Sequence, residues 1–220
     1  QQSSRKQLLQ DLMRRMNLKM NKGLLIVVSA PSGCGKGTVL HEILKDDSFY
    51  CSVSATTRKP REGEINGVNY YFLSKEEFEQ KIKDDAMLEY AQYCENYYGT
   101  LKQEVDSNLE KGKNVILEID VQGAMQIKKQ RPEGVFIFML PPSVKELERR
   151  LRKRGTETDD VIALRVAEAE GEIKQASKYD YVMVNAALED AVEDFKTIVN
   201  AQKFKAERAE NLIDEVLKNA

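Results

Sequence analysis

Residues 23–38 read "GLLIVVSAPSGCGKGT", an unbroken apolar run followed by a glycine-rich stretch that carries a single lysine. The apolar run from Leu24 to Val28 is typical of a strand that is buried on both faces. A helical pattern begins at Gly37, so the glycine-rich segment connects a strand to a helix N-terminus. Such a loop offers backbone N–H groups and the positive end of a helix dipole to an anion. The stretch therefore predicts an α/β fold with an anion site at this loop.

The loop resembles the P-loop pattern G-x-x-x-x-G-K-[ST], with two departures. Ala30 stands at the first glycine, and Gly37 stands where a serine or threonine would hold magnesium. Lys36 can reach the β- and γ-phosphates of a nucleoside triphosphate, and we expect Thr38 to approach the metal only through a water molecule. The predicted triphosphate site consists of Ala30, Pro31, Ser32, Gly33, Cys34, Gly35, Lys36, Gly37 and Thr38.

Further short apolar runs have the same character as the first strand. They lie at Leu24 to Ser29, Val115 to Ile119, Val135 to Leu140 and Tyr181 to Asn185, and helical patterns separate them at Gly37 to Leu44, Lys102 to Lys111 and Val144 to Arg152. Alternation of buried strands and helices favours a parallel sheet with helices on both faces. We therefore predict a three-layer α/β core of the P-loop kinase type.

Two charged segments interrupt this alternation. The segment 54–100 contains "REGEINGVNYYF", whose glycine and asparagine punctuation predicts a small antiparallel lobe. The segment 146–172 is dense in arginine and has no clear apolar face, which indicates a mobile helical lid. The predicted domains are an N-terminal extension at 1–19, a core made of 20–53, 101–145 and 173–220, the lobe at 54–100 and the lid at 146–172.

The composition excludes several classes of protein. The chain has 220 residues, of which 41% are hydrophobic and 32% are charged, and its net charge is −2. The small net charge gives no reason to expect nucleic acid or a membrane surface as a partner. Three cysteines without metal-ligand spacing and without a secretory signal predict a reduced, cytoplasmic protein. A single histidine, His41, excludes a histidine-rich metal site.

A triphosphate site alone does not distinguish GTPases, motors and kinases. The sequence lacks an "NKxD" guanine-specificity run, and its length leaves little room for a motor. A kinase also needs an acceptor site, and the lobe supplies one: Arg58 and Arg61 are spaced to hold one phosphate by charge-assisted hydrogen bonds. A carboxylate such as Glu89 suits a base rather than a phosphate. Guanine fits because its edge presents two donors that one carboxylate can accept.

At these residues the chain resembles the guanylate kinase family in its bacterial form, one of the nucleoside monophosphate kinases. The resemblance covers residues 23 to about 205 and is specific. It rests on "SAPSGCGKGT", "TTRKPREGEINGVNYYF", "EYAQYCENYYGT", "ILEIDVQGA", "PPS", "RLRKRGTET" and "VMVN". It implies transfer of the γ-phosphoryl group of ATP, with Mg²⁺, to GMP and dGMP in purine nucleotide metabolism.

The resemblance also implies individual roles. Lys36 and the lid arginines Arg150, Arg154 and Arg165 are implied as catalytic. The GMP phosphate is held by Arg58, Arg61, Tyr70 and Tyr98 with Glu64 in support, guanine is read by Ser54, Glu89 and Thr100, and Glu118 and Asp120 form the floor between the substrates. Glu118 departs from the aspartate that the family usually has at that position. By contrast, Arg149, Arg152 and Lys153 are interpreted as solvated helix charges.

Two rival functions remain open from the sequence. One is a kinase that phosphorylates another nucleotide, such as AMP or CMP. The other is a non-catalytic peptide-binding module, because guanylate-kinase-like domains of scaffold proteins reuse the GMP site for phosphorylated partners. Such domains typically lack a complete phosphate cradle, so Lys36 and the lid arginines argue against this second function.

Two further expectations concern Cys34 and the C-terminal segment. Cys34 lies beside Lys36 at a helix N-terminus, which favours the thiolate, so we expect its alkylation to inhibit and ATP to protect it. The last thirty residues are expected to form one long helix, with a seam of apolar residues that begins at Leu188. The seam is weakly apolar from Gln202 to Ala209. This favours packing on its own domain over a homo-oligomer contact.

Overall fold

A computed structural model describes residues 22–155, 157–208, 213 and 216–218. The N-terminal extension predicted at 1–19 lies outside the described residues. The core is a five-stranded parallel sheet in the order β2-β7-β1-β8-β9. Its strands are β1 (Leu25–Ser29), β2 (Phe49–Cys51), β7 (Asn114–Glu118), β8 (Val135–Leu140) and β9 (Tyr181–Val184).

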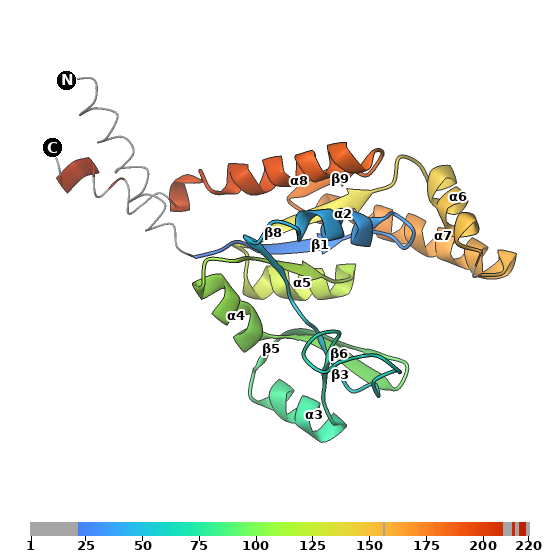
Figure 1. Ribbon diagram of the computed structural model, residues 1–220, viewed down its shortest axis with the longest axis horizontal. Helices are drawn as coiled ribbons and strands as arrows, with labels where there is room; N and C mark the ends of the chain where they lie inside the picture. The colour runs from blue at the N-terminus through green and yellow to red at the C-terminus, as the bar shows by residue number, and fades with distance from the viewer. Residues whose placement is uncertain (1–21, 156, 209–212, 214–215, 219–220) are drawn as a thin grey trace.

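Helices cover both faces of the central strands, as their unbroken apolar runs require. The edge strand β9 departs from the prediction of a strand buried on both faces, because Val182 and Val184 are exposed. On one face α2 (Lys36–Ile43) and α8 (Leu188–Gln202) pack against the sheet, with Phe195 and Ile43 fully buried. On the other face lie α4 (Lys102–Glu110) and α5 (Val121–Gln130), which bury Val105 and Ile127. Figure 1 shows these three layers. The predicted three-layer α/β core is confirmed.

The inserted lobe has a sheet and a small core of its own. Its strands are β3 (Ala55–Thr56), β4 (Tyr71–Phe72), β5 (Met87–Tyr93) and β6 (Asn96–Leu101), in the order β4-β3-β6-β5. Only the β3–β4 pair is parallel in this described sheet. Helix α3 (Lys75–Lys83) begins at a capping box between Ser74 and Glu77, and it buries Phe78. The lobe lies below the core in Figure 1, on the side of α4 and α5.

The lid is a pair of packed helices, α6 (Val144–Arg154) and α7 (Asp159–Ile173). The absence of an apolar face predicted for this segment is wrong. Leu147 and Leu151 of α6 are buried against Ile162 and Ala169 of α7. Four buried positions suffice because the two helices cover each other. Arg149 and Arg152 are exposed, whereas Arg150 and Arg165 contact the glycine-rich loop.

The C-terminal segment differs from the expected single long helix. Helix α8 ends at Gln202, and a 3-10 helix, η2, follows at Ala206–Arg208. Residues 209–212, 214–215 and 219–220 lie outside the described part of the chain. Along α8 the predicted seam residues Phe195 and Val199 are buried in the core of the same domain. The part of the seam on α8 thus packs within its own domain, as the sequence favours, whereas Ile213 and Val216 further along are exposed.

A short 3-10 helix, η1 (Ala176–Lys178), connects the lid to β9. Within the described residues, we find no helix with the length and apolar character that crossing a membrane requires.

Candidate active site

The glycine-rich loop between β1 and α2 forms an open cradle at a helix N-terminus. Gly33 and Gly35 have φ values of 87° and 90°, in the left-handed region that favours glycine. A side chain at Gly35 would also clash, because a Cβ there would lie 2.7 Å from the Nδ2 atom of Asn185. The two glycines therefore let the loop curl tightly at the N-terminus of α2, a position at which helices favour anions.

The two departures from the motif have different consequences. Ala30 is half-buried and packs against the hydrophobic core, so its methyl group fits the loop. Beside Gly37, a Cβ atom would meet nothing within 4 Å among the described residues. The hydroxyl expected there is missing, but the space that it would occupy is open. Thr38 lines the same cleft one residue later.

A cleft of about 940 Å³ extends from the cradle to the lobe. The cradle residues Lys36 and Thr38 line it from the core, and Ser54 and Tyr70 line it from the lobe. Its remaining predicted members are Ala30, Pro31, Ser32, Gly33, Gly35, Gly37, Glu118 and Asp120. Residues that are far apart in the sequence thus border one cavity.

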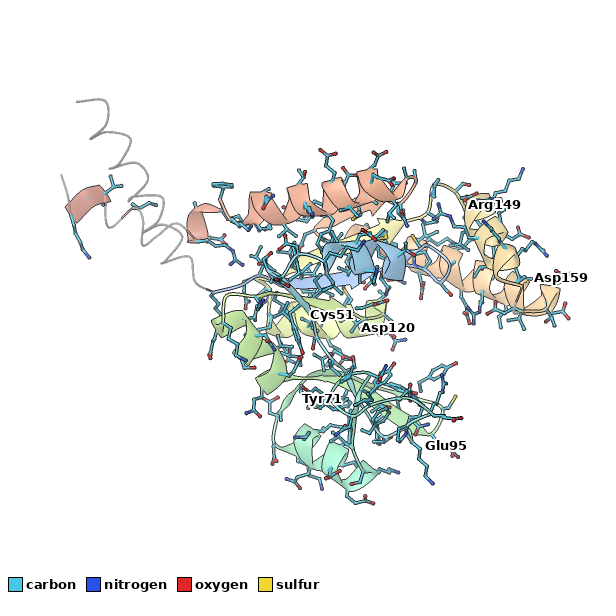
Figure 2. The ribbon with its side chains drawn as sticks, viewed as in Figure 1. Cys51, Tyr71, Glu95, Asp120, Arg149 and Asp159 are labelled. Atoms are coloured by element: carbon cyan, nitrogen blue, oxygen red, sulfur yellow. The ribbon has the colours of Figure 1, made fainter. Side chains whose placement is uncertain are left out.

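Two carboxylates line this cleft, Glu118 as the last residue of β7 and Asp120 two residues later. The Nζ atom of Lys36 lies 3.6 Å from the Oε1 atom of Glu118, a loose ion pair. Asp120 is the N-cap of α5, and its Oδ1 atom accepts a 2.7 Å hydrogen bond from the Gly123 backbone N–H. Figure 2 shows Asp120 at the edge of the core that faces the lobe. Ligands of parallel sheets bind at this carboxyl edge.

On the lobe, Arg58 is held by Glu64. Its Nη1 and Nη2 atoms donate hydrogen bonds of 2.9 and 2.8 Å to the two carboxylate oxygens of Glu64, and the Arg61 backbone N–H donates a third at 2.7 Å. These bonds lower the pKa of Glu64 to about 2. The guanidinium of Arg58 also lies 5.3 Å from the ring centre of Tyr70, whose ring meets Tyr98 edge-on. The structure thus places Arg58, Glu64, Tyr70 and Tyr98 next to one another in the lobe.

Glu89 is a buried carboxylate on β5. Burial raises its pKa to about 7, Asp120 adds to the rise, and a 2.7 Å hydrogen bond from the Thr100 hydroxyl opposes it. Such a group exchanges a proton near neutral pH.

The lid arginines contact the cradle. The Nη1 atom of Arg150 donates a 2.9 Å hydrogen bond to the Cys34 carbonyl oxygen, and its Nη2 atom donates to that of Asn185. Arg165 donates a 3.1 Å hydrogen bond to the Ser32 hydroxyl and forms an ion pair of 2.8 Å with Glu157. The side chain of Arg154 lies outside the part of the chain that the structure describes.

The other lid arginines behave as solvated charges, as predicted. Arg149 pairs with Glu146, and Arg152 pairs with Glu148, within one helix. Figure 2 shows Arg149 on the lid. Both arginines are exposed and both pairs follow from helical spacing. Arg152 also forms an ion pair with Asp159, the first residue of α7.

The prediction of a reactive Cys34 is wrong. The residue is fully buried, its Sγ atom donates a 3.4 Å hydrogen bond to the Met139 carbonyl, and burial raises the pKa of the thiol to about 12. Lys36 and Arg150 oppose the rise but do not overcome it. Only the backbone of Cys34 faces the loop, because its side chain enters the core.

Two residues of the site were missed by sequence reasoning. Asn185 donates a 2.8 Å hydrogen bond from Nδ2 to the Cys34 carbonyl and so braces the cradle from β9. Its place directly after the parallel strand β9 is the signal that could have found it. Glu172, at the end of α7, lines the cleft; burial raises its pKa, and Lys36 opposes the rise. No spacing distinguishes Glu172 from the other acids of that helix.

A P-loop cradle, a second lobe bordering the same cleft and an arginine-bearing lid define a nucleotide-binding phosphotransferase fold. The guanylate kinase family model matches residues 22–202. The guanylate kinase of Clostridium tetani is 55% identical over 194 residues, 88% of this chain and 93% of that protein. The guanylate kinase of Clostridioides difficile is 51% identical over 200 residues, 90% of this chain and 98% of that protein.

A solved structure agrees with these sequence comparisons. The crystal structure of guanylate kinase from Anaplasma phagocytophilum matches with a TM-score of 0.66 at 32% identity, and the match covers 87% of this chain and 95% of that one. The chain belongs to the guanylate kinase family.

Proposed function

We propose that this chain transfers the γ-phosphoryl group of ATP to GMP, giving ADP and GDP, and that it accepts dGMP as well. The observation that carries the proposal is the shared cleft, in which Ser54 and Tyr70 of the lobe face the same cavity as Lys36. A nucleotide held in the lobe would present its phosphate toward the cradle. Membership of the guanylate kinase family supports the same reaction.

On the donor side, the backbone of residues 30–38 holds the phosphates of ATP. Lys36 leaves its loose pairing with Glu118 and contacts the β- and γ-phosphates. The exchange costs little, since a partly exposed ion pair at 3.6 Å contributes only ~0–1 kcal/mol.

Magnesium fits this site when it arrives with the nucleotide. Among the described residues, no group of three or more His, Cys, Asp or Glu could hold a metal ion. The open space beside Gly37 and the nearby Thr38 leave room for water, so Thr38 would hold the metal through a water molecule. When bound, Mg²⁺ neutralises charge on the phosphate oxygens.

On the acceptor side, Arg58 and Arg61 hold the GMP phosphate together with Tyr70 and Tyr98. Glu64 supports them by fixing the Arg58 side chain. Glu89, Thr100 and Ser54 read guanine, and Glu118 and Asp120 form the floor between the two nucleotides. The acceptor oxygen of GMP is already ionised, so the reaction needs positioning and charge neutralisation rather than a general base.

The lid completes the site. Arg150, Arg154 and Arg165 gather at the transferring group when lobe and lid close, and closure excludes water that would hydrolyse ATP. The functional parts are the core at 20–53, 101–145 and 173–220, the lobe at 54–100 and the lid at 146–172. We place the enzyme in the cytoplasm, in agreement with its three free cysteines, and we assign it neither nucleic acid nor a membrane as a partner.

A coupled assay tests this proposal by offering ATP with GMP, dGMP, AMP and CMP in turn. Turnover is expected with GMP and dGMP. A Lys36→Met variant should lose on the order of 10³-fold in turnover, by analogy with other cations at phosphoryl-transfer sites. Lys45→Met, at an exposed position just after α2, is the control and should keep normal turnover.

Three results would refute the proposal. The first is a preference for AMP or CMP, and the second is near-normal turnover of the Lys36→Met variant. The third is binding of phosphorylated peptides without turnover, which the scaffold-module alternative expects.

A further inference from the structure

One face of α5 lies against the edge strand of the lobe. Gly123, Gln126 and Gln130 are spaced at i, i+3 and i+7, which places them on a single face of the helix. The strand β5 is the last in the order β4-β3-β6-β5, so one side of its backbone has no strand partner in the described sheet. The helix face meets β5 on that side.

Side-chain amides take the place of the missing strand. The Tyr90 backbone N–H donates a 3.2 Å hydrogen bond to Oε1 of Gln126, and Nε2 of Gln126 donates a 3.1 Å bond back to the Tyr90 carbonyl. Nε2 of Gln130 donates a 2.9 Å bond to the Leu88 carbonyl. A carboxamide can do this because it carries one acceptor and a donor group side by side, as a peptide unit does.

Glu89 lies between the two residues that are held in this way. A Cβ atom at Gly123 would lie 3.1 Å from Oε2 of Glu89 and 3.4 Å from Oδ1 of Asp120. Asp120 caps the same helix through the Gly123 N–H. The helix that begins at a floor carboxylate thus also supports the strand that carries the guanine-reading carboxylate.

We propose that Gln126 is a positioning residue for guanine selection, which fixes Glu89 of the lobe against the core. This inference rests on the proposed function, in which Glu89 accepts hydrogen bonds from the ring N–H and the exocyclic amine of guanine. Accepting both donors at once requires the carboxylate to lie in the plane of the base. A small displacement of β5 therefore breaks one of the two hydrogen bonds between Glu89 and guanine without disturbing the fold.

The test compares GMP with IMP, which lacks the exocyclic amine. Dissociation constants for both nucleotides are measured by equilibrium titration for the parent chain, Gln126→Ala and Gln126→Glu. The loss of one hydrogen bond to a charged group corresponds to about tenfold in affinity. We expect GMP binding to weaken about tenfold in both variants and IMP binding to weaken much less, so that the preference for GMP over IMP shrinks.

Two further variants serve as a negative and a positive control. Gln122→Ala changes an exposed glutamine of the same helix and should leave both constants unchanged. Gly123→Ala places a methyl group against the Glu89 carboxylate and should shrink the same preference. Thermal unfolding of each variant shows whether it is folded.

The two proposals fail in different ways. A parent chain that does not phosphorylate GMP overturns the proposed function. An active parent whose preference for GMP over IMP is unchanged in folded Gln126→Ala and Gln126→Glu overturns the role of Gln126 alone. Equal weakening of GMP and IMP also overturns it, because a purely structural contact would affect both nucleotides alike.

Discussion

The raised pKa of Glu89 predicts that GMP binding strengthens as the pH rises through neutrality. In the unliganded protein this pKa is about 7 instead of the ordinary 4.5, chiefly because the carboxyl group is buried. Asp120 raises it further, and the Thr100 hydroxyl lowers it. The guanine edge offers two donors, so only the ionised carboxylate can accept both.

The magnitude follows from the fraction of ionised carboxylate. With a pKa of about 7, roughly a tenth of Glu89 is ionised at about pH 6 and roughly nine tenths at about pH 8. The dissociation constant for GMP should therefore fall about tenfold between those two values, which corresponds to about 1.4 kcal/mol.

The stability of the free protein should change in the opposite direction. A carboxyl group with a raised pKa binds its proton more tightly in the folded state than in the unfolded state. Its contribution to the free energy of unfolding is fully present below the ordinary pKa of 4.5 and is lost as the pH rises through about 7. Raising the pH should thus weaken the fold slightly while it strengthens GMP binding.

Equilibrium titration with GMP from about pH 6 to pH 8, on the parent chain and on Glu89→Gln, measures this effect. The phosphate of GMP itself titrates near ~6, but that contribution is common to both proteins. We expect the dissociation constant for GMP to depend more steeply on pH in the parent chain than in Glu89→Gln. At the upper end of the pH range, Glu89→Gln should bind GMP more weakly than the parent. Parallel pH profiles for the two proteins would refute the assignment of the titrating group to Glu89.

The remaining predictions concern a buried carboxylate and a buried thiol. Glu104 of α4 accepts hydrogen bonds from the Ser52 hydroxyl and from the next backbone N–H, so Glu104→Ala should lower the free energy of unfolding by about 1–3 kcal/mol in urea titrations. Glu110→Ala, at an exposed position on the same helix, serves as the control. If both variants lost equal free energy of unfolding, the stabilising role of the Glu104 hydrogen bonds would be contradicted. A thiol reagent should label the exposed Cys94 rapidly and leave buried Cys34 unmodified in the native protein. Mass spectrometry reads the sites, and rapid loss of activity with labelling at Cys34 would contradict its burial.

Much of the fold could be predicted from the sequence, because its central strands are apolar without interruption. A run such as Leu24 to Val28 has no polar position to turn toward water, so it must be covered on both faces. The loop that follows it has glycines at Gly33 and Gly35, where φ is positive, and Gly35 is also the motif glycine that precedes Lys36. For the cradle and the sheet, the conformation that the local sequence favours is also the one that the tertiary structure requires.

For the lid and for Cys34, the sequence alone did not determine the structure. On α6 the two buried leucines lie among arginines, and a sequence shows neither which helix covers them nor how few contacts suffice. For Cys34, the helix dipole and Lys36 favour the thiolate, whereas burial favours the thiol. Which effect prevails depends on whether the side chain points into the loop or into the core, and a glycine-rich loop permits either. Gln126 was missed for a similar reason, because its partners are backbone groups that carry no sequence signal.

The hydrogen bonds of Arg58 specify how it would meet a phosphate. Its Nη1 and Nη2 atoms hold the two oxygens of Glu64, and Nη1 also donates a 2.9 Å hydrogen bond to the Lys59 carbonyl. Among the described residues, none accepts from the remaining edge, formed by Nε and the second N–H of Nη2. That edge can donate two parallel bonds to one phosphate. Glu64 therefore does more than neutralise Arg58. It binds Nη1 and Nη2, fixes the plane of the guanidinium and leaves a two-donor edge free among the described residues, which suits the acceptor phosphate of the proposed reaction.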